Sequence, residues 1–303
     1  GVERDEARNV ELTPATTTTA AAATAASKNG IAVINNAWRE RFYRRQTRVE
    51  VADRASRRVD GNEPAYFWYE PTYSCELSMR YSDAMRDGAK WICNPQWLTP
   101  DEECIILSFG IGLSADFENA LYNHDVFPVK HCKILAFDPS NYAHSKSIQM
   151  LMDNGVKIER TGISAAPGSV DGRPTKTYRQ HLVDNNLLDK RITMFKIDVE
   201  GAEWGVFKNM HEQGCDLFNK IDMILVEFHH AGEGTNSNAQ RYRQTMDGIL
   251  KCGFRVYSRE GNPYNTCCAE LAFVHRDYIK RGYKKENDLE ALKEFQISLD
   301  NNV

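Results

Sequence analysis

Apolar residues recur along the chain in short runs, and each run ends in polar residues or glycine. Four of these runs have the length of buried β-strands, at 103–109, 133–137, 194–197 and 221–226. Three stretches carry apolar residues at helical spacing, at 142–154, 177–188 and 238–252. Strands that alternate with helices in this way favour βαβ units and a mainly parallel sheet. Two further strands are predicted at 253–258 and 270–275.

The residues that follow the four strands should gather at one edge of the sheet. In open α/β sheets ligands bind at the carboxyl ends of the strands, so this edge is the predicted functional site. The residues are Gly110 and Gly112 after the first strand, Asp138 after the second, Asp198 and Glu200 after the third, and Glu227 and His229 after the fourth. A second interpretation stays open for Glu200 and Glu203, in which their charge only stabilises the first turn of the next helix.

The turn around Gly110 and Gly112 would let a nucleotide-like ligand approach the backbone closely. Asp116 opens a helical segment directly after it. Asp138 is expected to be exposed at the tip of its strand, where it could accept both ribose hydroxyls of an adenosine group. A plain strand-to-helix turn at the glycines and an Asp-Pro turn at Asp138 are the competing interpretations.

Four sequence blocks in this order resemble the FkbM-type class of S-adenosylmethionine-dependent methyltransferases. They are 108–112 (SFGIG), 137–139 (FDP), 196–203 (KIDVEGAE) and 226–229 (VEFH). Within that class, 87–93 (DGAKWIC) is similar to the animal methyltransferase-like proteins, and the resemblance covers about residues 70–280. It implies an α/β, Rossmann-like methyltransferase fold with a mainly parallel seven-stranded sheet, helices on both faces and an N-terminal helical and low-complexity extension.

The resemblance also implies S-adenosyl-L-methionine as the cofactor and assigns roles at the strand edge. The expected cofactor-binding residues are Gly110, Gly112, Asp116, Asp138, Ser164 and Asp198. The expected catalytic residues, which would face the methyl group and the acceptor, are Asp198, Glu200, Glu227 and His229. Either carboxylate or His229 could remove the proton of a hydroxyl acceptor. An imidazole titrates near neutrality, at about pH 6.5, although a histidine after a buried strand is more often structural.

A divalent metal ion is a secondary expectation at the same edge. Oxygen and nitrogen donors suited to such an ion come from Asp198, Glu227 and His229, with Glu200 beside them. The ion could orient two acceptor oxygens. No ligand-spacing motif accompanies these residues.

Composition divides the chain into four parts. Residues 1–30 form a flexible Thr- and Ala-rich tail or stem, 31–60 a basic helix, 61–280 the methyltransferase domain with an aromatic, cysteine-containing entry segment at 61–100, and 281–303 a C-terminal helix or tail. The basic helix carries eight arginines and three acidic residues between positions 31 and 59. It could lie on an anionic membrane or touch nucleic acid, but a solvated helix packed on its own domain is the favoured interpretation.

Charge and hydropathy limit the partners. The net charge of −4 gives no electrostatic case for nucleic acid as the main partner. No window approaches the roughly 20 apolar residues that span a bilayer. Membrane contact is therefore expected only through the basic helix or through an anchor that a chain beginning at Gly1 would have lost. A small molecule or a glycan is the expected acceptor.

Eight cysteines are present without a Cys-x-x-Cys pair, which argues against a structural zinc site. Cys75 and Cys93 flank an irregular segment and could form a disulfide in an oxidising compartment. Cys267 or Cys268 could pair as well. Three others adjoin apolar strands or helices and are expected to be buried thiols: Cys104, Cys132 and Cys252.

The Thr- and Ala-rich segment 13–27 resembles an O-glycosylated stem, which favours the secretory pathway, in the Golgi lumen or outside the cell. The sequence has no Asn-x-Ser/Thr sequon, and a flexible cytoplasmic tail is the alternative. The function that the resemblance implies is O-methylation of a sugar or other small hydroxylated molecule. Two other functions stay open: a binding protein that keeps the fold without catalysis, and an NAD-using α/β enzyme whose ribose-binding acid is Asp138.

Overall fold

The computed structural model describes residues 69–82, 88–100, 102–123, 129–140, 145–170, 172–229, 235–261 and 268–285. The predicted tail at 1–30 and the predicted basic helix at 31–60 lie outside these residues, as do residues 61–68, His230, Cys267 and residues 286–303. Within the described ranges, no helix has both the length and the apolar character needed to cross a membrane.

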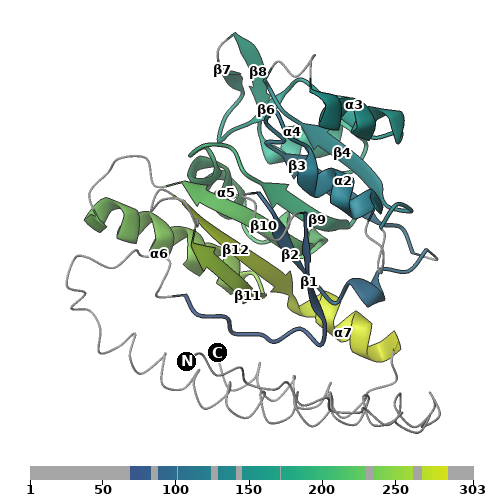
Figure 1. The fold of residues 1–303 in the computed structure, drawn as a ribbon. Coiled ribbons are helices and arrows are strands. Elements are labelled where there is room, and N and C mark those ends of the chain that lie inside the picture. Colours follow the sequence, from purple (N-terminus) through teal and green to yellow (C-terminus); the bar gives the residue numbers. More distant parts are fainter. Residues whose placement is uncertain are drawn as a thin grey trace, which may run out of the picture. The chain divides into compact units, whose positions relative to one another are not determined.

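A seven-stranded sheet forms the centre of the fold, in the order β11-β12-β10-β9-β3-β4-β5 (Figure 1). The strands are β3 (Ile105–Phe109), β4 (Lys133–Phe137), β5 (Lys157–Glu159), β9 (Ile192–Ile197), β10 (Ile221–His229), β11 (Phe254–Gly261) and β12 (Cys268–His275). Among these described strands only β12 runs antiparallel, between β10 and β11. The predicted mainly parallel, seven-stranded sheet is confirmed.

Helices cover both faces of the sheet, also as predicted. Every residue of β3 and β9 is buried, as expected for the continuous apolar runs of central parallel strands. On one face Phe109 and Phe195 share a core with α4 (Tyr178–Asp184), α5 (Glu203–Glu212) and α6 (Thr235–Lys251). On the other face Ile106 and Met194 share a core with α2 (Asp116–Asn123), α3 (Lys146–Asp153) and α7 (Arg276–Lys285).

The order of the strands reverses at β3, because the strands that follow it in sequence lie first on one side of it and then on the other. β3 pairs with β4 on one side and with β9 on the other. This reversal is a topological switch point, where ligands bind in open α/β sheets. The backbone N–H of Asp198 donates to the carbonyl oxygen of Phe109 at 3.1 Å, which brings the ends of β9 and β3 together. The loops after β3 and β9 thus flank the crevice in which a site is expected.

Two smaller sheets were not anticipated from the sequence. One contains β6 (Gly162–Ile163), β8 (Arg173–Lys176) and β7 (Gly168–Val170), and the other pairs β1 (Ser78–Tyr81) with β2 (Lys90–Cys93). Their strands have two to four residues, too short for a periodicity to show. Short 3₁₀ turns follow β2 at Pro95–Trp97 and precede β10 at Phe218–Lys220.

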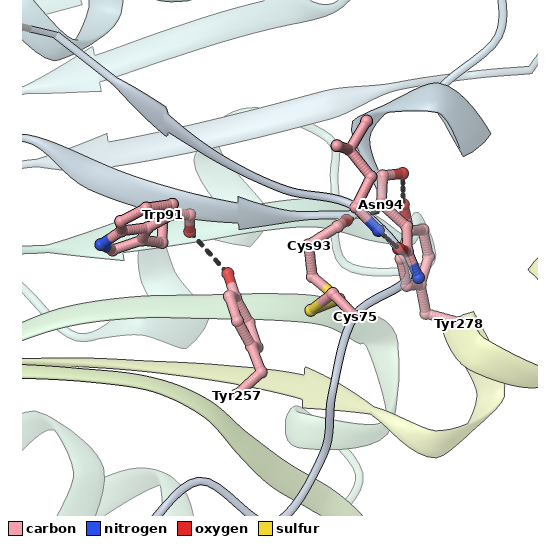
Figure 2. Close-up of a disulfide and its surroundings, with 7 residues drawn as sticks. Cys75, Trp91, Cys93, Asn94, Tyr257 and Tyr278 are labelled. Atoms are coloured by element: carbon pink, nitrogen blue, oxygen red, sulfur yellow. Dashed lines mark hydrogen bonds between the residues drawn. A yellow bond between two sulfur atoms is a disulfide. The ribbon is translucent and has the colours of Figure 1, made fainter. Parts of the chain in front are cut away.

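A disulfide closes the β1–β2 hairpin, and hydrogen bonds fix it to β11 and α7 (Figure 2). A disulfide joins Cys75 to Cys93, as predicted. The hydroxyl of Tyr257, from β11, donates to the carbonyl oxygen of Trp91 at 2.6 Å. The hydroxyl of Tyr278, from α7, donates to the carbonyl oxygen of Asn94 at 3.0 Å. β2 therefore has a defined position against the sheet.

The prediction of three buried free thiols is wrong. Cys104 is bonded to Cys132, with their Cα atoms 4.5 Å apart, and Cys252 is bonded to Cys215. The first pair has a simple cause, because its members directly precede the neighbouring parallel strands β3 and β4, whose first residues are in register. Cys268 is disulfide-bonded too. Every cysteine within the described ranges is thus oxidised.

Candidate active site

A cavity of about 800 Å³ opens at the carboxyl edge of the sheet, at the switch point between β3 and β9. Its size falls in the range typical of small-molecule and cofactor pockets. Most of the predicted site residues line it: Gly110, Gly112, Asp116, Asp138, Asp198, Glu200, Glu227 and His229. Ser164 is not among the lining residues, and its hydroxyl donates to the carbonyl oxygen of Ala166 at 2.5 Å. Eight of the residues predicted from the sequence therefore line one cavity.

The glycine turn after β3 depends on the absence of a side chain. Gly110 has a φ of +80°, and a Cβ at this position would lie 1.6 Å from the carbonyl oxygen of Asp198. Gly112 has a φ of +58° but open space around it. Glycine adopts positive φ at little cost. Gly110 is thus required both by conformation and by the close approach of the β9 loop, whereas Gly112 is required by conformation alone.

Asp138 is 3% exposed, so the expectation of an exposed carboxylate is wrong. One carboxylate oxygen accepts from the backbone N–H of Gly112 at 2.7 Å, and the other accepts from the N–H of Ser140 at 2.6 Å. The carboxylate turns inward because these two backbone donors need a partner. Each oxygen keeps a second lone pair. Asp138 thus fixes the glycine turn, and its role toward a ribose stays a prediction.

A buried lysine, which the sequence reading did not assign a role, lies behind Asp198. The ammonium nitrogen Nζ of Lys90, from β2, donates to Glu270 and to Asp198, the latter at 3.3 Å, and lies 3.8 Å from Glu227. Burial alone would lower the pKa of Lys90, but the charges of Glu270, Asp198 and Glu227 outweigh it and raise that pKa. Lys90 therefore stays protonated at neutral pH.

A second lysine lies near the same carboxylate oxygen of Asp198. Lys196, the penultimate residue of the otherwise apolar strand β9, donates from Nζ to the carbonyl oxygen of Gly110 and lies 3.8 Å from Asp198 and 4.0 Å from Glu118. Burial alone would raise the pKa of Asp198, yet the charges of Lys90, Lys196 and His229 lower it to about 2. Asp198 is therefore a charged hydrogen-bond acceptor rather than a base at neutral pH.

His229 is held in one orientation by Glu203. A carboxylate oxygen of Glu203 accepts from the backbone N–H of His229 at 2.6 Å and from its ring nitrogen Nδ1 at 3.1 Å. A carboxylate only accepts, so Nδ1 carries a proton and Nε2 is the atom that can gain or lose one. Nε2 lies 3.6 Å from Glu200 and 3.9 Å from Asp198. Burial lowers the pKa of His229, but the hydrogen bond and charge of Glu203, with Asp198 and Glu227, raise it to about 9.

The first two carboxylates of the KIDVEGAE block, those of Asp198 and Glu200, differ in exposure. The side chain of Asp198 is 18% exposed, and that of Glu200 is 89% exposed. Glu200 also has a φ of 55°, which is unusual for a residue with a Cβ. The turn thus points Asp198 into the cavity wall and Glu200 toward solvent at its rim.

The residues at this edge do not fit a divalent metal ion. Carboxylate oxygens of Asp198, Glu227 and Glu270 lie within 4.8 Å of one another, but the ammonium group of Lys90 already lies among them. A second grouping of Glu227, His229 and Cys268 includes a cysteine that is disulfide-bonded and has no thiolate to offer. The expected metal site is therefore not supported.

Sequence reasoning missed five polar residues around the cavity: Lys90, Glu118, Lys196, Glu203 and Glu270. One of them carried a readable signal. Lys196 interrupts an otherwise apolar strand, and a buried lysine needs a partner. Glu118 and Glu203 are compatible with ordinary first turns of helices, and both acidic residues do lie in the first turns of α2 and α5. Lys90 and Glu270 come together only through the placement of the β1–β2 hairpin.

Comparison with known proteins gives a family and a set of distant structural neighbours. A sequence family described as a methyltransferase domain matches residues 21–275. No curated protein matches the chain.

Among solved structures, the Methanococcus jannaschii fibrillarin pre-rRNA processing protein is 8% identical, with 65% of this chain and 88% of that chain covered at a TM-score of 0.36. Aeropyrum pernix fibrillarin with natively bound S-adenosyl-L-methionine is 13% identical, with 58% and 69% covered at 0.35. The N-methyltransferase NodS from Bradyrhizobium japonicum WM9 is 10% identical, with 60% and 92% covered at 0.32. Likenesses at this level say nothing about the acceptor.

Proposed function

Because the chain belongs to the methyltransferase-domain family that matches residues 21–275, we propose that it transfers a methyl group from S-adenosyl-L-methionine to a hydroxyl of a sugar or other small molecule. The observation that carries this proposal is the imidazole of His229, oriented by Glu203 at the wall of a cofactor-sized cavity. The finer placement in the FkbM-type class is part of the proposal and rests on the blocks at 108–112, 137–139, 196–203 and 226–229.

The cofactor would lie over the glycine turn. Gly110 and Gly112 give it access to the backbone, and Asp138 and Asp116 line the same cavity. S-adenosyl-L-methionine supplies a methyl group on a positively charged sulfur. A nucleophilic oxygen can attack this methyl group and displace the sulfur. Asp198, ionised between two lysines, is the anionic side chain that would face this charge.

His229 is the base in this proposal. A neutral imidazole with its proton on Nδ1 has a lone pair on Nε2, which can accept the proton of an acceptor hydroxyl. With a pKa of about 9, His229 is protonated at neutral pH before the cofactor binds. A positive charge placed close to an imidazole lowers its pKa. Binding of a sulfonium beside Asp198 would therefore lower the pKa of His229 and increase the fraction of molecules whose Nε2 has a free lone pair.

The acceptor side of the cavity is rich in hydrogen-bond acceptors. Glu227 and His229 are two residues apart on β10, so their side chains lie on the same face of the strand. Both line the cavity with Asp198 from the neighbouring strand. Carboxylates accept hydrogen bonds from hydroxyl groups. This arrangement supports an acceptor with several hydroxyls, such as a sugar, and lends the NAD-enzyme alternative no specific support.

The disulfides support a place in the secretory pathway, as a proposal. Disulfide bonds persist in oxidising compartments and are rare in the cytosol. Three of them join distant parts of the described chain, Cys75 to Cys93, Cys104 to Cys132 and Cys215 to Cys252. A glycan acceptor would be available in the same compartment.

The test is a ligand panel followed by turnover. Isothermal calorimetry with S-adenosyl-L-methionine, S-adenosylhomocysteine and NAD should show binding of the first two only. At about pH 8, S-adenosyl-L-methionine should release protons that S-adenosylhomocysteine, with its neutral sulfur, does not. A panel of methyl glycosides and small diols with labelled cofactor then identifies the acceptor, and His229→Asn should lower turnover on it by about 10²–10⁴-fold. Binding without turnover on any acceptor would favour the inactive binding protein, and binding of NAD alone would overturn the assignment.

A further inference from the structure

Lys90, Asp198, Glu227 and Glu270 form an ion cluster at the cavity wall, and only part of this cluster lines the cavity. Asp198 and Glu227 line the cavity, whereas Lys90 and Glu270 do not. The side chain of Lys90 is 2% exposed, and its ammonium group contacts all three carboxylates. Lys90 is thus a fixed cation that reaches the site from behind.

The three carboxylates would repel one another without a cation between them. Glu227 and Glu270 are directly opposite on the antiparallel strands β10 and β12. Like charges at such a position destabilise a sheet. Asp198 follows β9, which is the other neighbour of β10. Three neighbouring strands therefore bring carboxylates to one point, and Lys90 from β2 provides the positive charge there.

A buried cluster of this kind is a poor way to gain stability. Removing charges from water is costly, and well-packed apolar residues often serve a core equally well or better. The sequence nevertheless places Lys90 there, on a two-stranded hairpin outside the main sheet that is fixed by Cys75–Cys93. Perturbed, buried ionisable groups beside a cavity favour a functional role.

We propose that Lys90 is a positioning residue of the methyl-transfer site, whose ammonium group holds the carboxylates of Asp198 and Glu227 charged and directed into the cavity. This inference rests on the proposed function. Lys90 takes the place that a metal ion was expected to take, so the site has a built-in cation. Its partner Glu270 accepts a hydrogen bond from Lys90 and does not line the cavity; burial raises the pKa of Glu270, and the charge of Lys90 opposes that rise.

Other charged groups also face Asp198, and they set what loss of Lys90 would do. Lys196 and His229 approach it from β9 and β10. Glu118 of α2 lies near Lys196, and the exposed Glu200 lies near His229. Lys90 is the largest of the charges that lower the pKa of Asp198. Its removal should therefore raise that pKa, although Lys196 and His229 remain.

The test uses a double variant that separates charge balance from position. Lys90→Met alone leaves three carboxylates without their cation, so it should be unstable. Lys90→Met with Glu270→Gln removes one charge of each sign and touches no residue that lines the cavity. A control is Arg281→Met, which breaks a partly buried ion pair, that of Arg281 with Asp222 at 2.6 Å near the opposite end of β10. Each protein is assayed by melting temperature, by kcat and KM on an acceptor from the panel, and by calorimetry with S-adenosyl-L-methionine at several pH values.

Glu270→Gln alone is the reference for the melting temperature, and the double variant should melt close to it. The double variant should nevertheless lose about a hundredfold or more in kcat, with a smaller change in KM. Its affinity for S-adenosyl-L-methionine should fall more from pH 7 to pH 5 than that of the wild type or of Arg281→Met, because Asp198 takes up a proton in addition to the change at His229. A double variant with the melting temperature, the kcat and the pH profile of the wild type would show that Lys90 is only a structural ion-pair partner. A wild-type protein that binds no S-adenosyl-L-methionine would overturn the proposed function, and the inference with it.

Discussion

A single carboxylate oxygen of Glu203 accepts hydrogen bonds from both the backbone N–H and the ring Nδ1 of His229. The other carboxylate oxygen accepts from the N–H of Gly201 at 2.9 Å. Glu203 is fully buried at the start of α5, so it ties the β9 turn, the helix and the end of β10 together. The imidazole of His229 consequently has a fixed tautomer and a fixed direction, with Nε2 toward Asp198 and Glu200.

Stability should depend on pH through His229. The pKa of His229 is about 9 in the folded protein and about 6.5 in an unfolded chain, so folding favours the protonated form. The resulting stabilisation is fully present below about pH 6.5 and is lost as the pH rises through about 9, on the order of 3 kcal/mol in all. Denaturant unfolding of the wild type between pH 6 and pH 10 should show this loss. His229→Asn should show a smaller slope over the same range, and an equal slope in both proteins would contradict the pKa assignment.

The turn after β3 should tolerate alanine at one glycine and not at the other. Gly110→Ala places a Cβ 1.6 Å from the carbonyl oxygen of Asp198, so the β9 turn must move. We expect a lower melting temperature and loss of measurable cofactor binding. Gly112→Ala meets no atom within 4 Å and suffers only from its φ of +58°, which should cost about 1 kcal/mol. Calorimetry and melting curves on both variants test the difference; equal effects would show that the close approach is unimportant.

The sheet and the helices could be predicted because their signals are local. The apolar runs at β3, β4, β9 and β10 are long enough to identify strands, and each prediction was confirmed. The glycine turn and the carboxylates after these strands came together because parallel strands present their carboxyl ends at one edge. Residues adjacent to a recognisable strand therefore lie at the predicted edge, although the exposure of Asp138 was predicted wrongly.

The remaining parts of the site depend on contacts between distant segments. Lys90 reaches the site on a four-residue strand that has no periodicity of its own, and Glu270 faces Glu227 only because β12 inserts antiparallel beside β10. The inward turn of Asp138 depends on which backbone N–H groups lack a partner. The disulfide of Cys104 with Cys132 was readable in principle, since both directly precede strands that pair in register. It was missed because burial was taken as a sign of a free thiol.

Asp138→Ala should now affect both binding and folding. The carboxylate holds the N–H groups of Gly112 and Ser140, so its loss leaves two partly buried donors without this partner. We expect about 1–3 kcal/mol of destabilisation. Affinity for S-adenosyl-L-methionine should fall about ten- to a hundredfold. Asp138→Asn is the matched comparison, because its amide oxygen can keep one of the two hydrogen bonds. An unchanged dissociation constant in folded Asp138→Ala would remove Asp138 from the cofactor site.

The cysteines predict a thiol count. Every described cysteine is disulfide-bonded. In protein unfolded under non-reducing conditions, these cysteines should therefore not react with a thiol reagent. Reduction before unfolding should expose them and should lower the melting temperature, since each disulfide typically contributes about 2–4 kcal/mol. Eight reactive thiols without reduction would show that the disulfides do not form and would remove the main support for a secretory location.

The two carboxylates of the KIDVEGAE block should respond differently to removal of their charge. Asp198 is ionised between Lys90 and Lys196 in the cavity wall, so Asp198→Asn keeps its shape but leaves two buried ammonium groups with less compensation. We expect turnover to fall by about 10²–10⁴-fold and cofactor affinity to fall with it. Glu200 is 89% exposed, and its ion pair with His229 at 3.6 Å is open to solvent.

For Glu200→Gln we therefore expect near-normal cofactor binding and less than about a fivefold change in turnover, because exposed ion pairs contribute about 0–1 kcal/mol. Initial rates on the acceptor found by the panel, calorimetry and melting curves measured on both variants decide the matter. If Glu200→Gln loses as much turnover as Asp198→Asn at an unchanged melting temperature, the exposed carboxylate takes part in catalysis after acceptor binding. If Asp198→Asn instead lowers only the melting temperature, the charge at the end of β9 is structural, and His229 with Glu203 would be left as the sole support for methyl transfer at this edge.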